Sequence, residues 1–145
     1  MKPLHKILKN MHDKYAVLFP ETTAVKVQST SVRLVKNGFP KIPADYREFL
    51  TTTDGLSFNG LELFSIEPHE RDKGAFKHTA IEADAELRAG NPLLKDKLVI
   101  GQAPEILIAF NNIEQKYELL NRGDYEVLLK LPRFFDVLYY FAPEK

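Results

Sequence analysis

The chain has 145 residues, of which 20 are basic, 20 are acidic and none is cysteine. A chain of this length typically forms one domain with its own core. The absence of cysteine excludes disulfides, thiol nucleophiles and thiolate metal ligands, and the balanced charge argues against nucleic-acid binding, which usually requires a basic excess.

Residues 1–19 carry scattered lysines and histidines, so they lack the unbroken apolar run of a secretory signal. No apolar stretch approaches the roughly 18 residues that a bilayer-spanning helix needs. A protein without cysteine also has no need of an oxidising compartment. We therefore expect a cytoplasmic protein that does not bind membranes.

The first third of the chain predicts three helices. Apolar residues recur at steps of three or four over residues 2–19, which indicates a helix that Pro20 ends. Residues 22–36 mix helical spacing with β-branched residues that favour a strand, and we interpret them as a helix closed by Asn37-Gly38. A short helix over residues 43–53 follows, because proline suits the first helical position.

The middle of the chain alternates turns with short regular segments. Asp54-Gly55 and Asn59-Gly60 are turn dipeptides, and residues 61–66 should form the strand that follows them. Residues 67–74 are polar and contain proline and glycine, so they predict an exposed loop. Residues 78–89 predict a helix that ends at a glycine.

The last third predicts a run of strands and a closing helix. Residues 97–102 and 105–111 form two strands, and the second is apolar on both faces, which is typical of a strand covered on both sides. Residues 116–120 can pair with residues 125–131 across a four-residue turn. Pro132 then opens the last helix.

The order of these elements indicates the fold class. Strands gathered in the second half, with helices before and after them, favour an antiparallel sheet. We predict an α+β fold, in which residues 1–145 form a single domain with a mostly antiparallel sheet of about four to six strands flanked by helices.

Three local patterns, taken in order, resemble the SUKH superfamily, which is named in part after a yeast regulator of cell-wall assembly. The patterns are Ile42-Pro43-Ala44-Asp45-Tyr46-Arg47-Glu48-Phe49-Leu50, Asp54-Gly55 with Asn59-Gly60-Leu61-Glu62-Leu63-Phe64, and Leu98-Val99-Ile100-Gly101. The segment Phe134-Phe135-Asp136-Val137-Leu138 is similar to the closing Phe-rich helix of that family. The match covers residues 42–141. It departs from the commonest members in its Val- and Thr-rich second segment and its lack of tryptophan.

The resemblance implies a module that binds another protein. Bacterial members of the superfamily are regarded as immunity proteins that neutralise secreted toxins by direct contact, so a toxin domain is the partner we expect. A regulatory scaffold, like the eukaryotic relatives, is the alternative that the resemblance leaves open.

The residues themselves favour a protein without catalytic activity. The sequence contains no Gly-rich phosphate loop, no Gly-x-Ser-x-Gly elbow and no His-Glu-x-x-His pair. His69 beside Glu70 could act as a general base, although a charged loop is more often solvated surface. We predict no enzyme, no metal and no cofactor; an enzyme that uses the His69 loop is the lesser alternative.

Polar loops held by the sheet are the places where we expect a partner to bind, because scaffolded loops carry most recognition. Aromatic and arginine side chains on them are the usual anchors of interfaces. The candidate partner-binding residues are Glu70, Arg71, Asp72, Phe76, Asn112, Glu114, Tyr117, Arg122, Asp124 and Tyr125.

Overall fold

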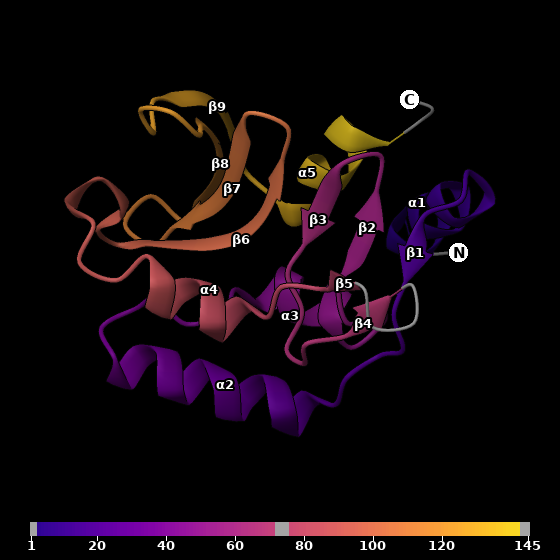
Figure 1. The fold of residues 1–145 in the computed structure, drawn as a ribbon, viewed down its shortest axis with the longest axis horizontal. Helices are drawn as coiled ribbons and strands as arrows, with labels where there is room; N and C mark the ends of the chain where they lie inside the picture. The colour runs from indigo at the N-terminus through magenta and orange to yellow at the C-terminus, as the bar shows by residue number, and fades with distance from the viewer. Residues whose placement is uncertain (1–2, 72–75, 143–145) are drawn as a thin grey trace.

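The computed structural model, which describes residues 3–71 and 76–142, contains one large antiparallel sheet with helices around it (Figure 1). The spatial order of its seven strands is β1-β2-β3-β6-β7-β8-β9. The strands are β1 (Val17–Leu18), β2 (Leu56–Phe58), β3 (Leu61–Leu63), β6 (Lys97–Ala103), β7 (Ile106–Asn111), β8 (Lys116–Asn121) and β9 (Val127–Leu131). The predicted α+β class and antiparallel sheet are therefore confirmed, but the sheet has seven strands instead of four to six.

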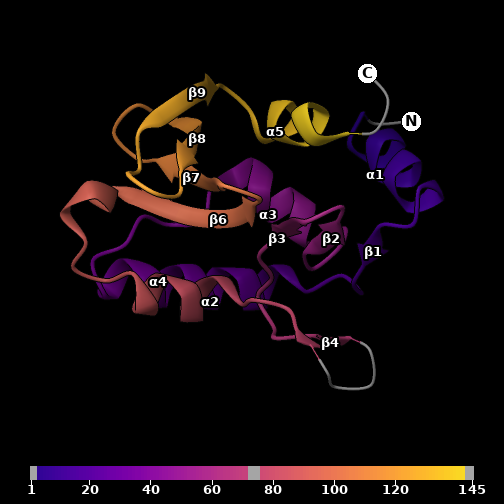
Figure 2. The same cartoon turned by 45° about the horizontal axis from the view of Figure 1, so that its top comes forward.

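Five α-helices of the described chain flank the sheet. They are α1 (Pro3–Asp13), α2 (Ala24–Lys36), α3 (Ala44–Leu50), α4 (Ile81–Leu87) and α5 (Phe134–Phe141), and a short 3-10 helix spans Pro92–Leu94. Figures 1 and 2 place α2 and α4 side by side below β6, with α5 on the other side of that strand. α3 lies between them, packed against both α2 and α5.

One contiguous core joins the sheet to these helices. At its centre the ring of Tyr46 lies 4.9 Å from that of Phe134 and 5.3 Å from that of Phe49. The Tyr46 hydroxyl donates to the main-chain carbonyls of Phe64 and Ile100, which belong to neighbouring parts of the sheet. Helical spacing puts Tyr46, Phe49 and Leu50 on one face of α3, and all three are fully buried.

The predicted first helix is too long. α1 ends at Asp13, and Tyr15 adopts a left-handed conformation with φ of 73° that turns the chain. Residues 17–18 then pair with β2, with Val17 opposite Ser57. The apolar period continues past Asp13, but pairing with β2 stabilises an extended conformation at residues 17–18.

The segment with conflicting signals is a helix, as we interpreted it. The side chain of Thr23 caps α2 by accepting a hydrogen bond from the Lys26 N–H at 3.2 Å, which satisfies one of the open donors at a helix start. Asn37 and Gly38 end the helix, and Gly38 has a φ of 88°. The capped start of α2 therefore favours the helix, and it outweighs the strand preference of the β-branched valines.

Other boundaries also differ from prediction; the strand expected over residues 61–66, for example, ends at Leu63. The segment expected as a loop, residues 67–74, contains the short strand β4 (Glu70–Arg71), which pairs with β5 (Phe76–Lys77) just after that segment. The last helix begins two residues after Pro132, because Arg133 is its cap and its N–H donates to the Asp136 carboxylate at 3.1 Å. The central strand covered on both faces is confirmed, since β7 is an interior strand buried over nearly its whole length.

Candidate partner-binding surface

The predicted partner-binding residues lie on three separate parts of the molecule. Asn112 and Glu114 are exposed in the turn before β8, whereas Arg122 and Asp124 are exposed in the turn after it. The whole length of β8 lies between these turns. Glu70 belongs to the β4–β5 hairpin, which lies apart from β8 in both views (Figures 1 and 2). These residues therefore do not form a single surface.

Several of the predicted residues are unsuited to that role or lie outside the description. The prediction that Tyr117 binds a partner is wrong, because its side chain is only 1% exposed and its hydroxyl donates to the Asp45 carboxylate. Tyr125 is half-buried and packs against the core. Asp72 and the side chains of Arg71 and Phe76 lie outside the described residues.

His69 meets a buried carboxylate, but a different one from its sequence neighbour. Its Nε2 lies 2.8 Å from Asp54 Oδ2, and its ring stacks on Phe19 with centroids 4.6 Å apart. The same carboxylate also accepts hydrogen bonds from the N–H groups of Ile66 at 2.7 Å and Glu67 at 3.1 Å. Asp54 therefore fixes the position of the chain after β3, and its contact with His69 contributes to the same structural role.

A row of four side chains, three of them polar, runs across the strands at the β1 end of the sheet. Val17 is opposite Ser57, Ser57 is opposite Glu62, and Glu62 is opposite Gln102. Cross-strand partners project from the same face of a sheet, so these four side chains lie on one face. They form the floor of a hollow of about 590 Å³, which Tyr15, Asn59 and Arg122 also line.

The floor of this polar hollow is held rigidly. One oxygen of the Glu62 carboxylate accepts hydrogen bonds from Gln102 Nε2 at 2.7 Å and from the Thr79 hydroxyl at 3.1 Å. The other accepts one from the Thr79 N–H at 2.9 Å and lies 3.5 Å from His78 Nδ1. Since the carboxylate is fixed before any partner arrives, little ordering entropy is lost there on binding.

Charge of both signs surrounds the hollow. Burial raises the pKa of the neighbouring Asp84 carboxyl above its ordinary value, and the negative charge of Glu62 adds to that rise. Arg88, which lies 2.9 Å from Asp84, and Arg122 lower the pKa of the same carboxyl. Arg122, whose positive charge acts on Asp84, is also one of the residues that line the hollow.

Tyr15 is the residue of the hollow that sequence reasoning missed. Its side chain is 93% exposed, although its helical spacing had predicted that it would lie on the apolar face of a helix. The misleading signal is the step of four residues from Met11 to Tyr15 and of three from Tyr15 to Leu18, which fits a continuing helix. Of the predicted residues whose side chains the structure describes, Arg122 alone lines this hollow.

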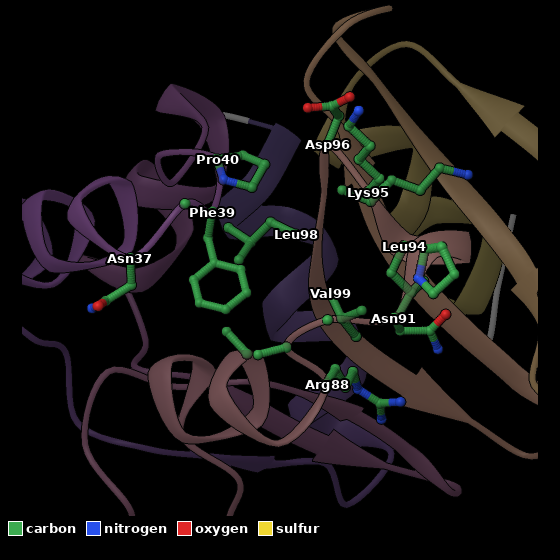
Figure 3. Close-up of a pocket in the computed structure, with 16 residues that line it drawn as sticks. Asn37, Phe39, Pro40, Arg88, Asn91, Leu94, Lys95, Asp96, Leu98 and Val99 are labelled. Carbon is green, nitrogen blue, oxygen red and sulfur yellow. The ribbon is translucent and has the colours of Figure 1, made fainter.

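A second hollow of about 390 Å³ lies between the α2–α3 connection, α4 and β6 (Figure 3). Figure 3 shows Phe39 and Leu98 facing this space, while the charged ends of Arg88 and Lys95 point away from Phe39. Apolar walls of this kind accept an apolar side chain more readily than a charged ligand.

The described residues 3–71 and 76–142 contain no group of three or more histidine, aspartate or glutamate side chains placed to hold a metal ion. Within the same residues, no helix has the length and apolar character needed to cross a bilayer.

No family model matches the chain, and a search of curated proteins finds no match.

Proposed function

We propose that this chain is a non-enzymatic protein-binding module of the SUKH type, and that it neutralises a toxin domain by direct contact. The observation that supports the proposal is the polar hollow, where the exposed Tyr15 and Arg122 border a fixed floor built by Glu62 and Gln102. Tyrosine and arginine are the residue types that most often dominate binding energy at protein interfaces.

The shape and chemistry of the hollow suit a protein partner. A hollow lined by both apolar and polar side chains, with the Arg122 guanidinium among them, suits a protruding loop that offers apolar contact together with carboxylates. Because Tyr15 has so little contact with its own chain, its ring is available to be buried by a partner, and aromatic burial contributes strongly to affinity.

The test is a binding measurement with a toxin domain encoded beside the gene for this chain. We expect titration calorimetry to give a complex and a toxin assay to show inhibition. Tyr15→Ala and Arg122→Ala should each weaken binding by about 2 kcal/mol, or roughly thirty-fold in Kd. Tyr139→Ala and Lys116→Ala change exposed residues away from the hollow and should leave the Kd within about two-fold.

Two results would contradict the proposal in different ways. If the neighbouring toxin neither binds nor loses activity, the immunity function is wrong. If the toxin binds and is inhibited, but both hollow variants bind as well as the original chain, toxin binding stands and the polar hollow is not the contact surface.

A further inference from the structure

The outer face of α2 carries apolar side chains that no part of the described chain covers. Val25, Val32 and Val35 are 74%, 49% and 55% exposed. Steps of seven and three residues put them on one stripe of a helix, opposite the buried face that Val27 and Leu34 form. Valine lowers helix stability through its restricted side chain, and at these positions it gains no compensating burial.

The C-terminal half of this stripe borders a groove. Val32 and Val35 on α2 face Ile42 and Ala44 across a space of about 420 Å³. The Ile42 N–H donates to the Ser31 hydroxyl at 2.9 Å, which fixes the second wall against α2. The groove is therefore a built feature of the fold with an apolar lining.

The rim of the groove is positively charged. Lys36, Lys41 and Arg47 line it and are exposed, and none of them has a carboxylate within 4.0 Å among the described residues. By contrast, Arg33 on the other side of α2 is paired with Glu82 at 2.9 Å. Three unpaired cations beside an apolar strip are complementary to a segment that carries carboxylates on either side of an apolar row.

We propose that this α2–α3 groove binds an acidic amphipathic helix of a partner protein. In such helix-in-groove binding, apolar residues at positions i, i+3 or i+4, and i+7 occupy the groove. Flanking glutamates or aspartates would then lie against Lys36, Lys41 and Arg47. The groove shares no lining residue with the polar hollow, so this proposal stands independently of toxin binding.

The probe for the test is a synthetic helical peptide with leucines at i, i+3 and i+7 spacing and glutamates at its other positions. The matched control peptide has lysine in place of every glutamate. Titration of the isotope-labelled chain, followed by amide resonances, should show shifts around Val32, Lys36 and Ile42 with the acidic peptide alone. Added salt should weaken the binding, because exposed charge contacts are screened.

Variants of the chain test the charged rim and the apolar lining of the groove separately. The triple change Lys36→Glu, Lys41→Glu and Arg47→Glu should weaken acidic-peptide binding at least about ten-fold. The same charge change at Lys6, Lys95 and Lys116 should have much less effect. Val32→Gln with Val35→Gln should also weaken binding without loss of helix content, because both positions are exposed.

Three outcomes would overturn the proposal. One is that the acidic peptide leaves the resonances of α2 and α3 unchanged. Another is that the lysine peptide binds equally well. The third is that the same resonances shift with protein concentration alone, which would make a second copy of the chain the occupant. The toxin assay is unaffected by any of these results.

Discussion

At the scale of single residues, Tyr15 is in a conformation that its side chain disfavours. A left-handed conformation costs an L-residue about 1–2 kcal/mol because its β-carbon approaches the backbone, and glycine usually occupies this position after a helix. The ring is almost wholly exposed, so burial does not offset the cost. Strain of this kind tends to persist at functional positions.

Replacement of Tyr15 by glycine should therefore raise stability while it weakens binding. We expect Tyr15→Gly to unfold at higher urea concentration than Tyr15→Ala, by about 1 kcal/mol in free energy, because alanine keeps the β-carbon that causes the strain. Both variants should bind the toxin domain less tightly. Equal stability of the two would show that the conformation is not strained.

At the scale of elements, one carboxylate joins three parts of the fold. Asp45 in the first turn of α3 accepts the Tyr117 hydroxyl from β8 and, at 2.7 Å, the Phe134 N–H at the start of α5. These partners are 72 and 89 residues away in sequence. A carboxylate in the first turn also favours the start of its own helix, but the longer-range role of Asp45 follows from the packing.

Removal of this carboxylate should destabilise the whole domain. We expect Asp45→Ala to lower the free energy of unfolding by about 2–3 kcal/mol, because it leaves a buried hydroxyl and a helix N–H without an acceptor. Tyr117→Phe should cost less, and a double-mutant cycle in urea should show coupling of about 1 kcal/mol. Glu86→Ala on the exposed side of α4 is the control; a similar loss there would rule out a specific role for Asp45.

The sequence predicted the long elements better than the short ones. Helical spacing indicated α2, and a proline at the first position indicated α3. Alternation indicated β6, apolar residues on both faces indicated β7, and the turn between β8 and β9 indicated those two strands. β1 and β2 were missed because strands of two or three residues have no measurable period. Tyr117 was misjudged because its strand is buried on both faces: Glu118 is also buried there, where Lys97 lies 2.7 Å from it.

At the scale of the whole molecule, the polar hollow depends on strand pairing that local patterns do not reveal. Arg122 could be predicted as a binding residue because it lies in a turn that the sequence reveals. Val17, Ser57, Glu62 and Gln102 come from four strands, and only their register places them on one face. A one-residue slip would send every side chain of a strand to the opposite face.

The buried tyrosines make the stability of the whole domain sensitive to alkaline pH. Burial raises the pKa of Tyr46, with a further rise from the negative charges of Asp54 and Glu62. Burial likewise raises the pKa of Tyr117, and Asp45 adds to it. An unfolded tyrosine ionises near pH 10. Below that pH both states keep the proton, whereas above it only the unfolded state releases the proton, so stability falls as pH rises.

We expect the free energy of unfolding to decrease above about pH 10 by roughly 1.4 kcal/mol per pH unit for each of these two tyrosines. Urea unfolding at a series of pH values would measure how steeply the free energy of unfolding falls. Tyr117→Phe should reduce this slope by the contribution of one proton. Tyrosinate absorbance should show Tyr46 and Tyr117 ionising only as the domain unfolds, because the folded core disfavours their charged forms. If Tyr46 and Tyr117 ionised while the domain remained folded, their hydroxyls could not be held by the core as described.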